Sequence, residues 1–463
     1  MYKKAGYVLW LIPLAGVGLL LWWGLSALDL EDPVLKSPEG LAVLGRRTTF
    51  VLKAADASSG LREVRVTLTQ GGQEKVLLTQ TFPPGGEAGQ EAEISVTVAP
   101  AELGFAEGPA TLTATARDRS WRGFFQGRTA SFRREVVIDL VPLNLALVGV
   151  NHLLHFGGTG VMRYHLNKEV RESGVRVNGH FYPGYPLPKG EKGEYVAFFP
   201  IPLEPPLPFS VELVARPAVG EEVKRPVPLT LKPRKWRHDH MQLSEGFLRQ
   251  VAATFQVQHP DPLQAFLMVN REMRRANHER LRELCQHSRP EPLWSGAFQR
   301  YLGKPMARFG DKRTYIYQGK VVDHQTHLGE DLASLERSPV PATAAGVVVL
   351  AEPLGIYGNT VVLDHGLGIF SMYSHLSRFD VQPGERVEKG ARLGLTGATG
   401  LAGGDHLHYS VLVHGEFVDP LEWWDPKWHK DQVQTMLAVK APAAAPAAPA
   451  ERKAKPRPKK RGR

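Results

Sequence analysis

The alternation of apolar and polar residues predicts a first β-rich module from about residue 33 to 140. Apolar residues occur there at every second position, as in half-buried strands, and residues 64–68 (VRVTL) are an example. The pair Gly71-Gly72 is typical of a hairpin turn between two such strands. Short strands separated by turns favour an antiparallel sandwich, and an early DASSGL sequence resembles bacterial Ig-like modules.

A second β-rich module is predicted from about residue 141 to 235. Its apolar runs include residues 161–165 and 211–214, and prolines cluster in the turns around residues 202–208. Neither module contains a combination of residues that suggests catalysis. Roles as a spacer, in substrate docking or in partner docking therefore stay open for both.

The spacing of apolar residues changes to that of helices between residues 243 and 286. Ser244 is a suitable N-cap for a helix whose apolar face begins at Phe247, and Asp261-Pro262 is typical of the start of a longer helix. Two interpretations of this segment stay open. It is either a packed helical connector or a regulatory element that covers the groove of the following domain.

From about residue 302 to 425 the chain is β-rich again. Glycine-containing turns separate short apolar strands, of which residues 346–350 and 360–363 are examples. The pattern as a whole therefore predicts a mainly β protein. It consists of two β-sandwich-like modules, a helical connector and a C-terminal antiparallel β domain.

One long apolar segment lies near the N-terminus. Residues 7–28 carry no charge, and about 20 apolar residues span a bilayer. Lysines precede the segment and acidic residues follow it, so the positive-inside rule predicts that residues 1–6 are cytoplasmic and that the rest is exported. A single transmembrane helix is the favoured interpretation. The alternative is a cleaved signal peptide with a tolerable cleavage site at Leu25-Ser26-Ala27.

Composition and charge narrow the class of protein. The 463 residues suffice for two to four domains, and the single cysteine, Cys285, excludes an intrachain disulfide and a Cys-rich metal site. Of the net charge of +10, residues 440–463 contribute +8, from nine Lys/Arg and one Glu. This Pro- and Ala-rich tail is expected to be disordered. Its expected partners are anionic envelope polymers or lipid headgroups rather than a specific nucleic acid, and a solubilising extension is the alternative.

Two short motifs in the C-terminal domain carry the candidate chemistry, His327-Leu-Gly-Glu-Asp331 and His406-Leu-His408. Side chains at positions i and i+2 of a strand project from the same face, so His406 and His408 can point into one groove. His327 and Asp331 can converge across a turn. Because three protein ligands and an open fourth position define a catalytic zinc site, the motifs predict metal-assisted hydrolysis.

The base for such a reaction is expected to be an imidazole, because the chain contains no HExxH glutamate and an imidazole titrates near neutral pH. Glu330 is adjacent to Asp331 and is expected to point away from the site. His324, His365 and His414 match no catalytic pattern, so we expect them to have structural roles.

The motifs and their surroundings resemble the lysostaphin-type (LytM-like) zinc endopeptidases of bacterial cell walls, and the resemblance is confined to the C-terminal domain. Besides His327-x3-Asp331, the matching segments are Phe309–Arg313, Pro339–Ala342, Tyr357–Asn359, Tyr373–Leu376, Gly390, Thr396-Gly397 and Gly404–His408. The chain differs from many relatives at Asp405, where Pro is common, and at Tyr409, where Phe is commoner. Neither difference concerns an implied ligand.

The resemblance implies a compact antiparallel β domain of the duplicated hybrid motif type, with its site in an open groove. It implies one zinc ion per chain, with His327, Asp331 and His408 as ligands. His406 is the implied general base, and His375 is the second implied catalytic histidine.

The predicted function is that of a membrane-anchored zinc metalloendopeptidase that hydrolyses the peptide crosslinks of bacterial peptidoglycan. We expect it in the cytoplasmic membrane, with the catalytic domain in the periplasm and the β modules holding that domain within reach of the wall. Arg313 and Tyr373 either contact the peptide stems of the substrate or have structural roles. The alternatives are a non-catalytic LytM-like regulator that activates another wall hydrolase, and a protease of envelope proteins.

Overall fold

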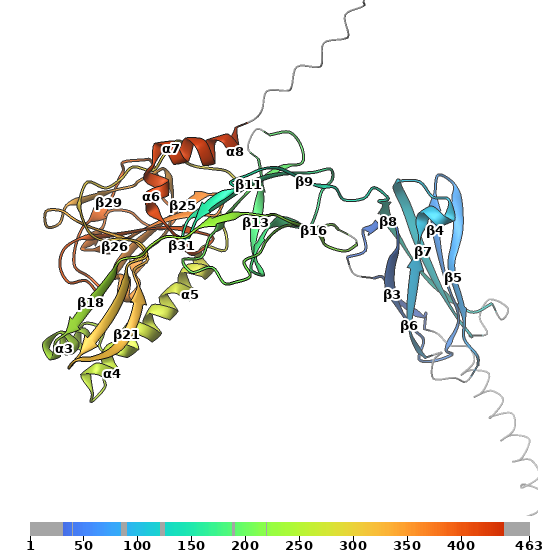
Figure 1. The fold of residues 1–463 in the computed structure, drawn as a ribbon. Coiled ribbons are helices and arrows are strands. Elements are labelled where there is room, and N and C mark those ends of the chain that lie inside the picture. The colour runs from blue at the N-terminus through green and yellow to red at the C-terminus, as the bar shows by residue number, and fades with distance from the viewer. Residues whose placement is uncertain are drawn as a thin grey trace, which may run out of the picture. The chain divides into compact units, whose positions relative to one another are not determined.

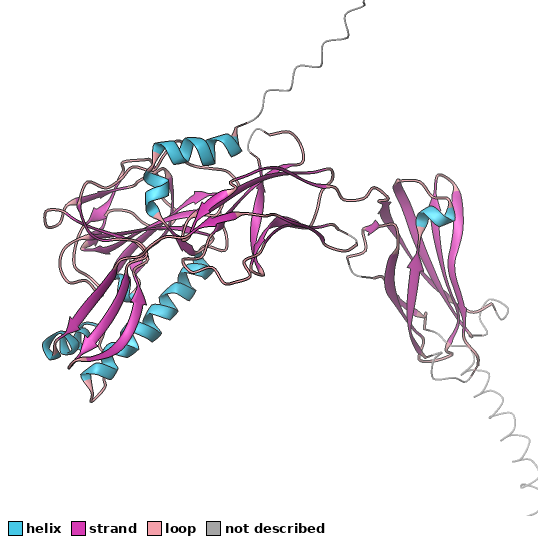
Figure 2. Ribbon diagram, viewed as in Figure 1, coloured by secondary structure: helices cyan, strands magenta, loops and turns pink. Residues whose placement is uncertain are grey.

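The computed structural model of this protein describes residues 31–38, 40–84, 90–120, 126–187, 190–218 and 220–438. Strands dominate these residues, as the sequence pattern predicts (Figure 2). Contacts divide the chain into two compact units. The predicted span at residues 7–28 and the tail at 440–463 lie outside the described residues, and no described helix has the length and apolarity needed to cross a bilayer.

The first unit extends to Asn144 and includes two later segments, Glu169–Arg171 and Ala215–Val223. It contains a three-stranded sheet of order β1-β3-β6 and a five-stranded sheet of order β2-β8-β7-β4-β5 (Figure 1). Its strands, with one short helix, are β1 Val34–Lys36, β2 Val43–Leu44, β3 Thr48–Ala55, β4 Leu61–Gln70, β5 Gln73–Thr81, β6 Glu91–Val98, η2 Pro100–Leu103, β7 Gly108–Asp118 and β8 Thr129–Ile138.

The two sheets of this unit enclose one apolar core. Leu52 of β3 and Val96 of β6 are buried together with Val64 and Leu112 of the larger sheet. In β3 and β6 buried and exposed residues alternate, because successive side chains of a strand point to opposite faces. The predicted turn at Gly71-Gly72 is confirmed, since both residues have positive φ and join β4 to β5.

The second unit contains the remaining strands in five sheets, the largest of which have the orders β16-β15-β12-β13-β14-β11-β9 and β19-β22-β30-β26-β25-β24-β28. In its first part the strands are β9 Leu145–Val150, β10 Leu153–His155, β11 Thr159–Leu166, β12 Glu172–Val177, β13 His180–Pro186, β14 Glu194–Pro200, β15 Val211–Arg216, β16 Val223–Pro226, β17 Thr230–Lys232 and β18 His238–Leu243. In its second part they are β19 Lys304–Ala307, β20 Lys312–Tyr317, β21 Lys320–Thr326, β22 Glu330–Ala333, β23 Pro339–Pro341, β24 Gly346–Pro353, β25 Asn359–Gly366, β26 Ile369–Leu376, β27 Arg378–Phe379, β28 Arg386–Val387, β29 Arg392–Leu395, β30 Leu407–Val413 and β31 Glu416–Val418.

The predicted module at residues 141–235 shares a hydrophobic core with the C-terminal domain. Phe198 of β14 lies 6.2 Å from Trp423 and 6.4 Å from Trp294, measured between ring centroids. Val161 of β11 belongs to the same buried cluster as Tyr373 of β26. The two segments therefore belong to one compact unit, a relation that no local sequence pattern expresses.

Helices flank the C-terminal domain. They are α3 Glu245–Thr254, α4 Pro262–Leu267, the π-helical η3 Met268–Met273, α5 Arg274–Leu284, η4 Gly355–Tyr357, α6 Pro420–Trp424, α7 Pro426–Trp428, the π-helical η5 His429–Gln434 and α8 Thr435–Leu437. Both predicted helix starts are confirmed, because the side chains of Ser244 and Asp261 accept hydrogen bonds from the first turns of α3 and α4. Phe266 and Leu281 of these helices share a core with Tyr315 of β20.

A buried carboxylate joins the two parts of the second unit. Oε2 of Glu422 in α6 accepts a hydrogen bond of 2.8 Å from the backbone N–H of Thr159 in β11. Burial raises the pKa of Glu422 from 4.5 to about 7. The folded protein therefore holds a proton on this group between pH 4.5 and 7, where the unfolded chain has released it.

This difference predicts a pH-dependent effect of Glu422→Gln. The folded state binds more protons in this window, so the wild-type free energy of unfolding falls as the pH rises from 4.5 to 7. A neutral glutamine at this position does not titrate, so the variant lacks this loss of stability. Its free energy of unfolding, relative to that of wild type, should therefore rise by on the order of 2–3 kcal/mol between pH 5 and pH 8. Calorimetric unfolding of both proteins at pH 5 and pH 8 measures this difference in free energy. A difference between variant and wild type that does not change with pH would contradict the raised pKa of Glu422. Glu388→Gln is the control, because the side chain of Glu388 is 79% exposed.

Candidate metal centre

The two motifs meet because of the register between β22 and β30. These antiparallel strands place Asp331 directly opposite His408, so both side chains project from the same face. His327 lies in the loop between β21 and β22, where its backbone N–H donates to the Asp311 carbonyl at 2.9 Å. Gly329 is required in this loop, because a Cβ atom at this position would lie 2.6 Å from Nε2 of His408.

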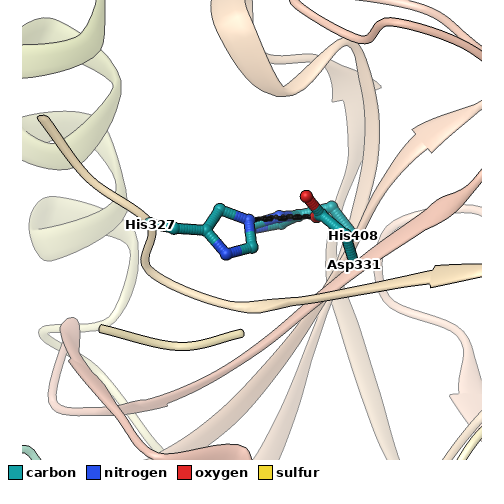
Figure 3. A group of neighbouring side chains, drawn as sticks. All are labelled: His327, Asp331 and His408. Carbon is teal, nitrogen blue, oxygen red and sulfur yellow. Dashed lines mark hydrogen bonds and ion pairs between the residues drawn. The ribbon is translucent and has the colours of Figure 1, made fainter. Parts of the chain in front are cut away.

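The three side chains converge on one point (Figure 3). Oδ1 of Asp331 lies 3.0 Å from Nε2 of His327 and 2.8 Å from Nδ1 of His408, and the two nitrogens are 3.1 Å apart. All three residues are buried. The convergence across the turn that the HxxxD spacing predicts is therefore present.

Outer hydrogen bonds determine which ring nitrogens face the centre. Nδ1 of His327 donates to the Arg308 carbonyl at 2.9 Å, which leaves Nε2 with a lone pair. The Ser410 hydroxyl donates to the Leu328 carbonyl at 2.8 Å and accepts from Nε2 of His408 at 3.1 Å, which leaves Nδ1 of His408 with a lone pair. Ser410 is not among the residues predicted from the sequence, although its position two residues after His408 on one strand face is a usable signal.

This donor set fits zinc. Two imidazole lone pairs and a carboxylate oxygen face one another with no hydrogen between them, an arrangement that a cation stabilises. Their separations of 2.8 to 3.1 Å are close to the edge of about 3.3 Å in a tetrahedron with Zn–N bonds of 2.0–2.1 Å. Two histidines and one carboxylate also form a common ligand set of catalytic zinc.

The ionisation states agree with metal binding. Burial lowers the pKa of His408 to about 4, so its imidazole is neutral at pH 7. Burial acts to raise the pKa of Asp331, but its close contacts with His327, His406 and His408 outweigh burial and hold this pKa well below its usual range. A neutral imidazole and an ionised carboxylate are the forms in which these groups ligate a metal.

His406 and His375 lie beside the three converging residues. Nε2 of His406 is 3.5 Å from Oδ1 of Asp331, and its Nδ1 donates to the Gly404 carbonyl at 2.8 Å. His375, the penultimate residue of β26, has φ +62°, a strained conformation for a non-glycine residue that often marks functional sites. Its Nδ1 donates to the Thr399 carbonyl at 2.7 Å, and its ring centroid is 4.8 Å from that of His406.

The pKa values of these two histidines move in opposite directions. Burial lowers the pKa of His375 to about 3, with further contributions from the neighbouring histidines. Burial also acts to lower the pKa of His406, but the hydrogen bond and the charge of Asp331 outweigh it and raise the pKa above its ordinary value. His406 therefore binds a proton more readily than His375.

Arg313 and Tyr373 have different surroundings. Arg313 lines the cavity at the site, and its Nη2 lies 3.3 Å from Oδ2 of Asp331, so it orients this carboxylate. Tyr373 is fully buried, and its hydroxyl is bonded to Thr343 and Ser371 at 2.8 and 3.0 Å. We therefore assign Tyr373 a structural role rather than the substrate contact that its sequence left open.

The three histidines expected to have structural roles, and Glu330, are not among the residues that line the centre. The Glu330 carboxylate points into the domain and accepts a hydrogen bond from the Phe309 N–H at 3.0 Å, as its predicted orientation requires. His324 bonds to the Thr314 hydroxyl, and His365 bonds to the Ala345 carbonyl. His414 is stacked on Tyr185.

The centre opens into a cavity of about 420 Å³. His327, Asp331, His375, His406 and His408 form part of its wall. The helical segment forms another part, through Phe247 of α3, Phe266 of α4 and Arg274 at the start of α5, and Leu243 at the end of β18 also contributes. The helical segment, for which the sequence leaves open a packed connector and an element that covers the groove, therefore lines the cavity beside the centre.

Comparisons with known proteins agree with this geometry. The sequence model of Peptidase family M23 matches residues 325–420. The chain is 35% identical over 130 residues to Peptidoglycan DD-endopeptidase ShyA of Vibrio cholerae, covering 27% of this chain and 30% of that protein. It is 39% identical over 95 residues to DD-carboxypeptidase/endopeptidase Mpg of Neisseria meningitidis, covering 20% and 22%. The chain thus spans less than a third of the length of these two relatives.

Among solved structures, the catalytic domain of lysostaphin from Staphylococcus simulans is similar with 27% identity and a TM-score of 0.23, covering 26% of this chain and 92% of that domain. The matched residues 325–420 include His327, Asp331, His375, His406 and His408. The predicted resemblance of the C-terminal domain is confirmed by the family match and the two relatives. Residues 325–420 of this chain form a domain of Peptidase family M23.

Proposed function

We propose that this protein is a zinc metallopeptidase that hydrolyses the peptide crosslinks of bacterial peptidoglycan. The observation that carries the proposal is the convergence of three lone-pair atoms from His327, Asp331 and His408 beside two further histidines. The names of the relatives above, a peptidoglycan DD-endopeptidase and a DD-carboxypeptidase/endopeptidase, support peptidoglycan as the substrate. They make bonds between D-amino acids the first to test.

Zinc bound at this centre would polarise the scissile carbonyl and make water a stronger nucleophile near neutral pH. His406 is the proposed general base. Its Nδ1–H is held by the Gly404 carbonyl, so Nε2 carries the lone pair that accepts the proton of the attacking water. The protonated imidazole then delivers this proton to the leaving amine.

His375 is the proposed second catalytic histidine. Its Nδ1–H is held by the Thr399 carbonyl, and its lowered pKa keeps the ring neutral at pH 7. Nε2 of His375 is therefore an acceptor that orients an N–H or O–H donor at the centre. Arg313 holds the Asp331 carboxylate in position through its contact with Oδ2.

We propose that residues 7–28 anchor the protein in the cytoplasmic membrane and that the site faces the envelope. The uncharged run with preceding lysines supports this topology. The module at residues 33–140 would serve as a spacer, and the basic tail at 440–463 would contact anionic envelope polymers or lipid headgroups.

The non-catalytic regulator is the less favoured alternative, because a protein that has lost hydrolysis has no need for the complete ligand set found here. A protease of envelope proteins would use the same centre. The first alternative is tested by the metal content of the protein and the second by the identity of its products.

The first prediction from the proposed function concerns the metal content of the protein. The purified full chain should hold about one zinc per chain by atomic emission spectroscopy, and His408→Ala should lose it. Ser410→Ala removes the acceptor that orients the His408 ring, and it should weaken zinc affinity about 10- to 100-fold in a chelator competition. His324→Ala is the control, since this histidine is exposed and bonded to Thr314. Retention of zinc by His408→Ala would contradict the ligand assignment.

The second prediction separates the general base from the ligands. His406→Ala should keep its zinc, because Nε2 of His406 is not one of the three converging atoms. It should lose activity about 10²- to 10⁴-fold, the usual contribution of general acid–base catalysis. Parallel zinc and rate measurements test this. Wild-type rates in His406→Ala would remove the residue from the proposed role.

The third prediction concerns the substrate. Zinc-loaded protein incubated with purified sacculi should release new peptide termini, identified by mass spectrometry, and His408→Ala should release none. The masses also identify the bond that is cleaved. Intact sacculi together with cleaved envelope proteins would instead favour the protease alternative.

A further inference from the structure

The helical side of the cavity carries a cation without an acidic partner. Arg274, the first residue of α5, lines the cavity together with Tyr357, His375 and His408. Its side chain is half-buried. Within the described part of the chain its polar contacts go to Asn270 alone, and none of them is to a carboxylate.

The guanidinium is held in place by neutral acceptors. Nε donates to the Asn270 carbonyl at 3.0 Å, and Nη2 donates to Oδ1 of Asn270 at 2.7 Å. An arginine has five N–H donors, so three remain for a ligand. Asn270 lies in the π-helical segment η3, and short π-helical turns are frequent at functional sites.

A buried network fixes this arrangement to the metal centre. Nδ2 of Asn270 donates to Oδ2 of Asp323 at 2.8 Å, and Nε of Arg271 donates to Oδ1 of the same carboxylate at 2.9 Å. Asp323 lies on β21, four residues before the ligand His327. Through Asn270 and Asp323, Arg274 is therefore connected to the strand that leads into the metal site. Such supporting hydrogen bonds are typical of preorganised binding sites.

The charges of the cavity favour an anion. Asp331 is the single carboxylate among the described residues that line it, and Arg313 already contacts that carboxylate. Phe247 and Phe266 lie on the same wall as Arg274, and low-dielectric surroundings strengthen an ion pair there. A carboxylate of a ligand would supply the anionic partner that Arg274 lacks in this wall.

A peptide has room to reach Arg274 from the metal centre. A second groove of about 600 Å³ shares Arg313, Asp331 and His406 with the cavity, and it continues past Met306 and Ala333. A peptide that lies across the centre can thus occupy the groove on one side and the cavity of Arg274 on the other.

We propose that Arg274 forms a carboxylate-binding subsite that recognises a free carboxylate of the peptide substrate, beside the bond to be cleaved. The inference takes its substrate class from the proposed function. It makes the helical segment a part of substrate recognition, and Asn270 and Asp323 are positioning residues for the guanidinium.

The test compares a crosslinked peptidoglycan peptide with analogues in which one free carboxylate at a time is a carboxamide. With zinc-loaded full chain, Arg274→Gln should raise KM for the acid peptide about 10- to 100-fold and leave kcat within about twofold. The analogue whose carboxamide replaces the recognised carboxylate should show this raised KM already with the wild-type protein. Arg274→Gln should not raise the KM of that analogue further. Arg274→Lys should restore part of the affinity. Arg275→Gln, at a neighbour paired with Glu279 on the exposed face, should match wild type.

Calorimetric binding to His406→Ala separates this inference from the proposed function. We expect tighter binding of the acid peptide than of the selected amide, and Arg274→Gln in this background should abolish the difference. Selective binding without any cleavage by wild type would support the subsite and overturn the proposed activity. Equal loss of activity on acid and amide peptides in Arg274→Gln, or equal binding of both by His406→Ala, would overturn the subsite.

Discussion

The antiparallel register between β22 and β30 is the constraint on which the rest of the site depends. It places Asp331 opposite His408, and the short loop before β22 then brings His327 to the same point. A shift of the register by one residue would turn His408 to the opposite face of the sheet. Such a shift is costly, because the neighbours Leu407 and Tyr409 are themselves buried in the core. The packing of apolar residues thus fixes the geometry of the polar ones.

Backbone carbonyls complete this design by selecting the tautomers of the histidines. The carbonyls of Arg308, Thr399 and Gly404 each accept a ring N–H, and Ser410 does the same for His408. Each imidazole therefore presents its remaining lone pair toward the centre. The groups that orient the histidines carry no net charge, whereas the charged Arg313 orients Asp331, the one carboxylate among the three proposed ligands.

The helical segment extends the site beyond the matched domain, and the second β segment shares the hydrophobic core of that domain. Asp323 of β21 links η3 and α5 to the strand before His327, and Phe198 of β14 packs against Trp423 of α6. Both contacts join segments far apart in the chain. The family match at residues 325–420 contains the metal centre, whereas Arg274 lies outside it.

The sequence by itself indicated the candidate chemistry and determined much of the local structure. Spacing alone indicated that His406 and His408 can point into one groove, that Gly71-Gly72 forms a turn, and that Ser244 and Asp261 begin helices. These features depend on the geometry of neighbouring residues, which the sequence expresses directly. The family resemblance then supplied the roles expected for His327, Asp331, His375, His406 and His408.

The tertiary structure decided what depends on contacts between distant segments. It placed Tyr373 in the core, because its hydroxyl meets Thr343 thirty residues earlier in the chain. It brought Ser410 to the His408 ring, Arg274 to the cavity wall, and the second β segment into the core of the C-terminal domain. No local periodicity encodes these contacts, since they follow from how sheets and helices pack to bury their apolar faces.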